Sequence, residues 1–358
     1  MPIIHKTFTT QKYTAVYLVD EDQDAMRLDQ FIQIYMESFS REAIKKKISN
    51  GDITIKNRPA PHRPSAKVYY KDQITLITKK TIHEDEYWNK KKLELITEPE
   101  IIYQDPFLSV LSKPPYMATH PTGKHLFNCA TVYLEEKLEK KTHSIHRLDR
   151  ETSGILLIGT DPKIAMQLTS EFENNQVKKC YFFIAKKSSL YRTDEFIAEE
   201  RLGPSEEGLK RVYIDHYPQD SENGKHAKTY FKVLFEDPIY ALGLAFPYTG
   251  RQHQIRVHAM AHGLQLIGDK LYLGNFKMFQ RFKDNIATPA DHNLMQLPRH
   301  ALHSMAINIK YNDKKTTFYS PIPKDLCHWI EQNLSLDINQ FENDLRSNIE
   351  NYFQKSFK

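Results

Sequence analysis

The segment HRLDRETSG, residues 146–154, runs directly into the apolar stretch ILLIG, residues 155–159, which is typical of a buried strand. Asp149 is therefore expected in a loop at the start of that strand, between Arg147 and Arg150. A carboxylate beside positive charge stays ionised and can act as a nucleophile or a base. The same residues also suit a structural ion pair between turn-forming neighbours. This segment alone leaves both interpretations open.

Patterns on either side of this strand predict a body that mixes helices and strands. Strands are expected at residues 101–110, 154–159, 180–185, 229–235 and 240–246, and helices at residues 162–174 and about 252–262. These elements do not follow the regular alternation that a doubly wound parallel sheet requires. Apolar residues at helical spacing near the end of the chain predict a helical appendage: Leu326, Trp329, Ile330, Phe341, Leu345 and Ile349.

A second polar segment, PYTGRQHQIRVHAMAHG, occupies residues 247–263. Gly250 permits a tight turn, Arg251 stands at the expected start of a helix, and Arg256 lies about one helical turn further on. A helix N-terminus with arginines forms a surface suited to phosphate groups. An ordinary amphipathic helix with a polar first turn explains the same residues, so this segment too leaves two interpretations open.

Basic residues are concentrated near the N-terminus. The whole chain has a formal net charge of +5, whereas residues 27–80 hold 12 basic and 5 acidic residues, a net charge of +7. Within this segment, apolar spacing predicts one helix from about Leu28 to Met36 and a second that Ser40 caps and Gly51 ends. The concentration of charge is typical of a phosphate-binding module, but a basic face that is only solvated and binds no partner explains it equally well.

The length of 358 residues suits two domains, or two domains with an appendage. No apolar run approaches the roughly 20 residues that a bilayer span needs, and the first residues lack the pattern of a secretory signal. The three cysteines are far apart and fit neither a disulfide framework nor a CxxC-type zinc site. We therefore expect a cytoplasmic protein without membrane segments.

Several motifs, taken together and in order, resemble the RluA-type RNA pseudouridine synthases. HRLDRETSG resembles the catalytic motif of that family, and TGRQHQIRVH with IGDKLY resembles its arginine-bearing motif. The resemblance spans about residues 95–330. The further matching stretches are IIYQDPFLSVLSKPPYMATHP (101–121), KKCYFFIA (178–185), GKHAKT (224–229), RHALHS (299–304) and FYSPIP (318–323). SREAIKKKISNGDITIKNR, residues 40–58, is similar to a small RNA-binding domain often joined to these synthases.

The resemblance implies roles for individual residues. Asp149 matches the catalytic aspartate, Tyr181 the tyrosine that stacks on the target base, and Arg256 the arginine that pairs with the carboxylate. Arg147 matches the residue that takes the place of the extruded nucleotide, and Arg251 is expected to contact RNA. In the basic segment, RNA contacts are expected from Arg41, Lys45 and Lys46. Lys113 and His120 are expected to have structural roles.

The resemblance also implies the architecture. The fold class is then α+β: a catalytic domain with a mixed, mainly antiparallel sheet and flanking helices, plus a small N-terminal α/β RNA-binding domain. The expected divisions are an extension (1–24), the small basic domain (25–80), a linker (81–99), the catalytic domain (100–330) and a helical appendage (331–358).

The implied reaction is the isomerisation of specific uridines in structured RNA, most naturally ribosomal RNA, with transfer RNA as the other substrate class. It needs no cofactor and no metal, and we expect a monomer. The rival interpretation is an inactive RNA-binding protein that retains the synthase fold. A metal site among the 16 histidines is disfavoured because carboxylate or cysteine partners at ligand spacing are missing. A nucleoside hydrolase would need a second carboxylate, for which Glu151 is the near candidate.

Overall fold

The computed structural model describes residues 3–36, 39–80, 84–123, 125–205 and 212–354. Residues 81–83 of the expected linker and 355–358 of the expected appendage lie outside this range. The chain forms two compact units, one made of Met1–Glu84 with His120–Glu139, the other of Asp85–Thr119 with Lys140–Lys358. Within the described ranges, no helix has the length and apolar character that a membrane crossing requires.

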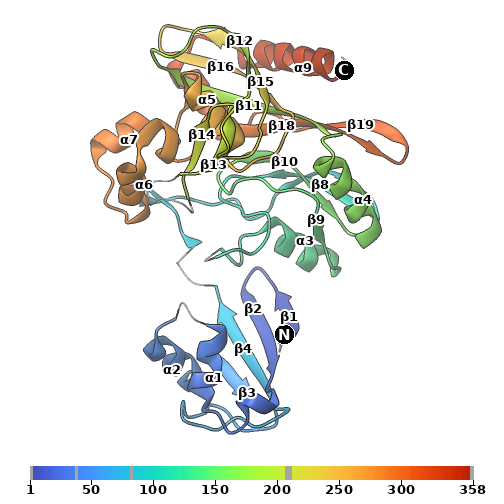
Figure 1. The fold of residues 1–358 in the computed structure, drawn as a ribbon, viewed down its shortest axis with the longest axis vertical. Coiled ribbons are helices and arrows are strands. Elements are labelled where there is room, and N and C mark those ends of the chain that lie inside the picture. Colours follow the sequence, from blue (N-terminus) through green and yellow to red (C-terminus); the bar gives the residue numbers. More distant parts are fainter. Residues whose placement is uncertain (1–2, 37–38, 81–83, 124, 206–211, 355–358) are drawn as a thin grey trace. The chain divides into compact units, whose positions relative to one another are not determined.

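The smaller unit contains one antiparallel sheet of four strands in the order β1-β2-β4-β3 (Figure 1). Its buried core gathers apolar side chains from the sheet and from the two helices α1 and α2. The elements are β1 (Ile3–Phe8), β2 (Lys12–Leu18), η1 (Glu21–Gln23), α1 (Leu28–Tyr35), α2 (Arg41–Ser49), β3 (Ile53–Ile55), β4 (Gln73–Lys79) and α3 (Ala130–Leu138).

Local sequence explains the two helices of this unit. The Ser40 side chain accepts a hydrogen bond from the Ala43 N–H and so caps α2, as predicted. The helix ends just before Gly51, whose φ of +77° is costly for other residues. Ile44 and Ile48 are buried, while Lys45 and Lys46 between them are exposed and Lys47 is partly buried. The short strand β1, which the sequence pattern did not reveal, pairs with β2 at the edge of the sheet.

The larger unit is built on a sheet of eleven strands. Its main path has the order β12-β15-β16-β11-β18-β10-β8-β7, with β17, β19 and β9 attached at the side. Among the described strands of this sheet, the pairing of β10 with β18 is parallel and the other pairings are antiparallel, so the fold is α+β with a mixed, mainly antiparallel sheet, as predicted.

The strands of this unit are β5 (Tyr87–Trp88), β6 (Lys91–Lys92), β7 (Glu100–Gln104), β8 (Leu108–Lys113), β9 (His143–Ser144), β10 (Ser153–Gly159), β11 (Lys178–Lys187), β12 (Glu195–Ala198), β13 (Arg201–Pro204), β14 (Ile214–Tyr217), β15 (Thr229–Glu236), β16 (Tyr240–Pro247), β17 (Leu264–Leu266), β18 (Leu302–Tyr311) and β19 (Lys314–Tyr319). The helices are α4 (Pro162–Glu173), α5 (Gln254–Ala261), η3 (Lys270–Gly274), α6 (Phe276–Lys283), α7 (Pro289–Met295), α8 (Lys324–Asn333) and α9 (Ile338–Gln354).

One strand prediction is wrong in detail. Residues 101–110 were expected to form one strand, but β7 and β8 are two antiparallel strands joined by a turn. The Asp105 carboxylate accepts hydrogen bonds from the N–H groups of Phe107 and Leu108, both at 2.8 Å, and this closes the turn before Leu108. Apolar residues continue on both sides of the turn, so the periodicity of the sequence does not indicate it.

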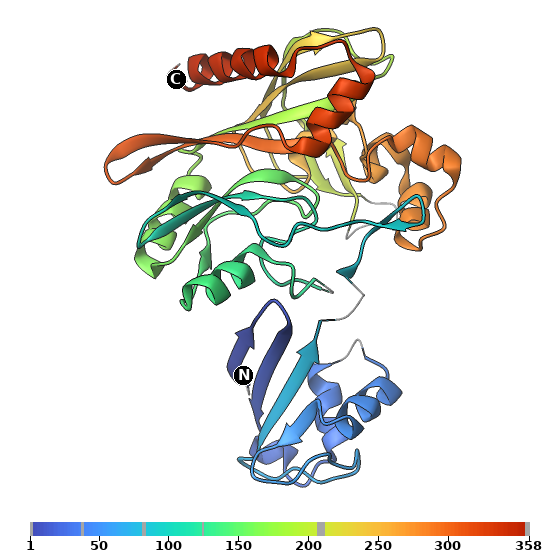
Figure 2. The ribbon, with the colours of Figure 1, turned by 180° about the vertical axis from the view of Figure 1, so that it is seen from behind.

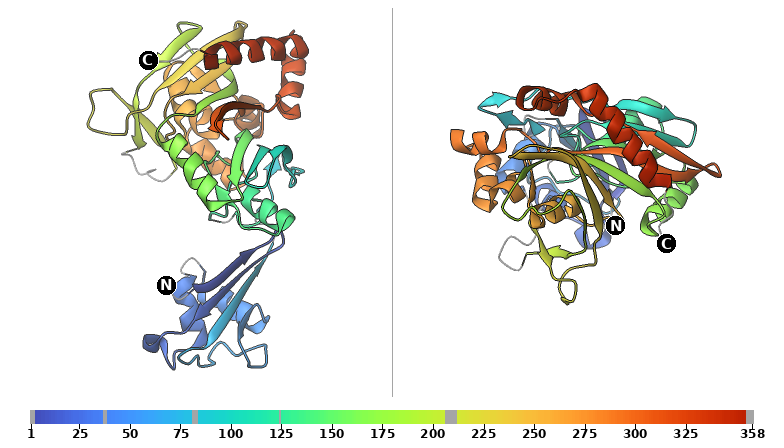
Figure 3. Two further views of the ribbon diagram at one scale, coloured as in Figure 1. Left: turned by 90° about the vertical axis from the view of Figure 1, so that its right-hand side faces the viewer. Right: turned by 90° about the horizontal axis from the view of Figure 1, so that it is seen from above.

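Strand β11 crosses the middle of the sheet, and its alternate residues face opposite sides. Phe182 packs in a core with Trp329 of α8 and Phe341 of α9, which cover one face (Figure 2). Phe183 packs with Ile255 of α5 on the other face. The ribbon seen from above shows α5 on the opposite side of the sheet from α8 and α9 (Figure 3). The odd-numbered residues of β11, which include Tyr181, are therefore presented on the side of α5.

Candidate active site

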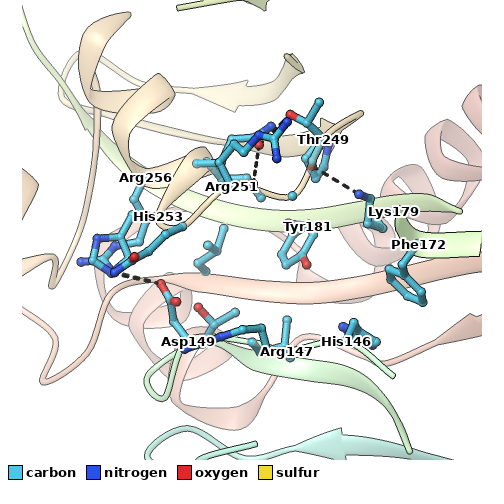
Figure 4. A pocket seen from close by; sticks show the side chains of 18 of the residues that line it. His146, Arg147, Asp149, Phe172, Lys179, Tyr181, Thr249, Arg251, His253 and Arg256 are labelled. Carbon is cyan, nitrogen blue, oxygen red and sulfur yellow. Dashed lines mark hydrogen bonds and ion pairs between the residues drawn. The ribbon is translucent and has the colours of Figure 1, made fainter. Parts of the chain in front are cut away.

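A cavity of about 670 Å³ opens in the larger unit (Figure 4). Its wall is formed by the loop between β9 and β10, the C-terminal end of α4, strand β11, and the segment that runs from the end of β16 into α5. The polar side chains that line the cavity include His146, Arg147, Asp149, Glu173, Lys179, Tyr181, Thr249, Arg251, His253 and Arg256.

Asp149 lies in the predicted loop before β10, and the loop is fixed on both sides. The Leu148 N–H donates to the Thr119 hydroxyl at 3.2 Å, and the Thr152 N–H donates to the Asp149 carbonyl at 3.1 Å. The fully buried Lys113 ammonium donates to the Arg150 carbonyl at 3.2 Å, which agrees with a structural role for this lysine. The carboxylate of Asp149 is thus presented to the cavity from a rigid loop.

Arg256 joins two carboxylates that are distant in sequence. Its Nη1 lies 3.1 Å from Oδ2 of Asp149, while its Nε and Nη2 donate to Asp269 at 2.6 and 2.9 Å. Burial alone would lower the pKa of Arg256, but the charges of Asp269 and Asp149 outweigh it and hold that pKa above its ordinary value. Burial likewise opposes the ionised form of Asp269, yet Arg256 keeps the pKa of this carboxyl below its usual range. The guanidinium is permanently charged and fixed in direction.

His253 is the second group beside the carboxylate. Its Nε2 lies 3.8 Å from Oδ2 of Asp149, and its Nδ1 lies 2.8 Å from the hydroxyl of Tyr272. That hydroxyl accepts the N–H of Ile214, so its own proton is available for Nδ1 of His253. Burial, helped by the charge of Arg256, lowers the pKa of His253 to about 4. The ring is therefore neutral at pH 7.

Tyr181 comes from β11, and its ring lies between Asp149 and Lys179 in the close view of the cavity (Figure 4). Burial, with a further contribution from the charge of Asp149, raises the pKa of this phenol to about 12. The side chain is neutral at pH 7 and offers a flat face together with one hydroxyl. It suits stacking on a planar base and the transfer of one proton.

The predicted RNA contacts fall in both units. Arg147 and Arg251 are exposed and line the cavity, and the Arg251 side chain donates to the His226 carbonyl at 3.0 Å. The remaining predicted contacts are exposed residues of α2 in the smaller unit: Arg41, Lys45 and Lys46.

Three residues of the site were not assigned a role from sequence: His253, Asp269 and Tyr272. All three stand in the motif stretches RQHQIR and IGDKLY, and His253 enters the sequence analysis only as one of the 16 histidines weighed as metal ligands. The sequence signal that could have revealed Asp269 is its position directly after Gly268, at the start of η3. Its side chain caps η3 by accepting the N–H groups of Leu271 and Tyr272.

Glu151 does not line the cavity. Its carboxylate lies 3.0 Å from the Lys270 ammonium and accepts the His300 N–H at 3.3 Å. Burial raises its pKa, but the charge of Lys270 outweighs burial and the net shift is downward. These contacts describe a structural carboxylate and argue against Glu151 as a second hydrolytic group. Among the residues that the structure describes, no group of three or more His, Cys, Asp or Glu side chains could hold a metal ion.

Residues 108–261 match the family model described as RNA pseudouridylate synthase. The chain belongs to the RNA pseudouridine synthases. An uncharacterized RNA pseudouridine synthase of Chlorobaculum parvum is 26% identical, with 86% of this chain and 94% of that protein covered. The ribosomal large subunit pseudouridine synthase C of Buchnera aphidicola is 26% identical over 89% of this chain and 96% of the relative. The mitochondrial tRNA pseudouridine(32) synthase of Saccharomyces cerevisiae is 31% identical over 70% of this chain and 51% of the relative.

A solved structure shares the pseudouridine synthase fold. Human RNA Pseudouridylate Synthase Domain Containing 1 matches with a TM-score of 0.53 and 18% identity, covering 72% of this chain and 98% of that chain. The enzyme class expected from the motifs, an isomerase that acts on RNA, is therefore confirmed. The roles of individual residues stay predictions.

Proposed function

We propose that this pseudouridine synthase converts specific uridines of ribosomal RNA at the cavity beside Asp149. The observation that carries the proposal is the Asp149–Arg256 pair at 3.1 Å, which faces a cavity that Tyr181 also lines. Relatives named as ribosomal large subunit synthases, from Buchnera aphidicola and Blochmanniella floridana, support ribosomal RNA as the substrate. The tRNA synthase among the relatives makes transfer RNA the alternative outcome.

The chemistry requires that the target nucleotide leave its helix. A flipped uridine costs a few kcal/mol of stacking and pairing, which new contacts in the pocket must offset. In the proposal, the ring of Tyr181 supplies a stacking face, and Arg147 occupies the space that the nucleotide leaves.

Asp149 then acts on the nucleotide to break the bond between N1 of uracil and C1′ of the ribose. The detached base turns, and C5 forms the new bond to C1′. The proton of C5 is removed with the assistance of Tyr181, and N1 carries a proton in the product. Atoms and electrons balance within the nucleotide, because the product is an isomer of the substrate. Arg256 holds the Asp149 carboxylate in a fixed direction through the 3.1 Å contact.

We further propose that residues 25–80 form an auxiliary RNA-binding domain, with contacts from Arg41, Lys45 and Lys46. Exposed basic side chains on one helix suit a phosphate backbone. The enzyme is proposed to work as a monomer in the cytoplasm, where its three free cysteines stay reduced. Light scattering of the purified protein tests the monomer.

The decisive experiment maps pseudouridines in total RNA from cells with and without the gene, and in RNA treated with the purified protein. The proposal expects a site in ribosomal RNA that disappears without the gene and returns with the protein. The Asp149→Asn variant should bind the same RNA and form no pseudouridine. If the pseudouridine map is the same with and without the gene, and the wild-type protein and Asp149→Asn both bind RNA, the inactive RNA-binding protein is favoured instead.

A further inference from the structure

Lys179 lies in the cavity on the other side of Tyr181 from Asp149 (Figure 4). It precedes Tyr181 by two residues on β11, so both side chains project from the same face of the sheet. Residues so related are about 6.6 Å apart along a strand. That is a span over which one nucleotide can contact both, through its base and through its phosphate.

The Lys179 ammonium has unused hydrogen-bonding capacity. The residue is only 7% exposed, and its hydrogen bond among the described residues is to the Thr249 carbonyl at 3.3 Å. An ammonium has three donors. Lys113, the comparable buried lysine, donates to three carbonyls, those of Pro114, Met117 and Arg150. No carboxylate within the described ranges forms an ion pair with Lys179, so its charge is desolvated without an anionic partner.

The neighbouring wall contains two stacked aromatic rings, and Glu173, which follows one of them, also lines the cavity. The ring of His146 stacks on Phe172 with centroids 4.5 Å apart and an interplanar angle of 15°. Burial, together with the nearby charge of Lys179, lowers the pKa of His146 to about 3, so this ring does not compete as a cation. These two rings thus give this end of the cavity flat, uncharged faces.

We propose that Lys179 binds the phosphate adjoining the target uridine while the uracil stacks on Tyr181. The anion would supply the missing partner of a desolvated ammonium, which is where a charge-assisted hydrogen bond is strongest. This inference rests on the proposed function, because it assigns a part of the same substrate to a second part of the cavity.

The test compares the binding of uridine and of uridine 3′,5′-bisphosphate to the full-length protein by calorimetry. The wild-type protein should bind the bisphosphate about ten- to a hundredfold more tightly, the range expected for a hydrogen bond to a charged group. In Lys179→Met this preference should vanish while the affinity for uridine is kept. Lys186→Met, on the same strand but outside the cavity lining, is the matched control and should keep the preference.

A second measurement needs no change that could disturb folding. Burial lowers the pKa of Lys179 to about 8, so the wild-type preference for the bisphosphate should decline between pH 7 and pH 10. His146 stays neutral over this range. The other charged groups that line the cavity are Arg147, Asp149, Glu173, Arg251 and Arg256, and the guanidinium groups keep their charge. Lys179→Arg should keep the preference at pH 10.

Equal affinity of the wild-type protein for the two ligands would overturn the inference, as would an undiminished preference in Lys179→Met. Neither measurement depends on turnover. A bisphosphate preference without pseudouridine formation would therefore reject the proposed function alone, and pseudouridine formation without the preference would reject the role of Lys179 alone.

Discussion

Two carboxylates share the guanidinium of Arg256, and their replacement is expected to have opposite consequences. Asp269 is fully buried and makes two bonds to Arg256, whereas Asp149 makes one at 3.1 Å and its side chain is 26% exposed. Removing one partner of a buried pair costs about 3–5 kcal/mol, while an exposed pair contributes about 1 kcal/mol or less. In Asp269→Asn the amide oxygen can still accept the N–H groups that cap η3, so a loss of about 3 kcal/mol is expected.

The catalytic effects should run the other way. Asp149→Asn should abolish pseudouridine formation, because the reacting carboxylate is gone. Asp269→Asn keeps Asp149 but leaves its partner less firmly held, and turnover should fall about ten- to a hundredfold.

Urea unfolding followed by tryptophan fluorescence measures the first effect, since both tryptophans, Trp88 and Trp329, lie in the larger unit. Turnover on RNA at pH 7 measures the second. The reasoning fails if Asp149→Asn lowers the free energy of unfolding as much as Asp269→Asn does, or if Asp269→Asn leaves both stability and turnover unchanged.

Three further results are expected. Tyr181→Phe should keep the affinity for RNA, because the ring remains, while kcat falls at least about a hundredfold with the loss of the hydroxyl; an unchanged kcat would exclude proton transfer by the phenol. Burial lowers the pKa of His303 to about 3, below its unfolded value of 6.5, so unfolding takes up a proton between these values and stability is lost as the pH falls through this window. In His303→Gln the free energy of unfolding, measured with urea, should depend less steeply on pH, by up to about 1.4 kcal/mol per pH unit. The control His328→Gln, which replaces an exposed histidine, should leave this pH dependence unchanged. Deletion of residues 1–80 should weaken RNA binding most at low salt and reduce its salt dependence, whereas an unchanged salt slope would remove this unit from RNA binding.

Local patterns predicted many elements of the larger unit closely. The helix expected at residues 162–174 is α4, because Asp161 caps it and Pro162 occupies its first position. The strand expected at residues 180–185 is the centre of β11. The hairpin β7–β8 was missed because a turn closed by the Asp105 side chain leaves little trace in apolar periodicity.

The sequence by itself determined the reaction class and predicted the residues that carry it, since motifs such as HRLDRETSG and TGRQHQIRVH are contiguous and keep their chemical character without a fold. Only the tertiary structure decided how these residues meet. Asp149 and Arg256 are 107 positions apart and come within 3.1 Å because β11 lies between β16 and β18, and β10 pairs with β18. The order of strands in a sheet depends on pairings between distant segments, which local periodicity does not encode. The same pairings place Asp269 behind Arg256 and leave Lys179 beside the cavity without an anionic partner within the described residues.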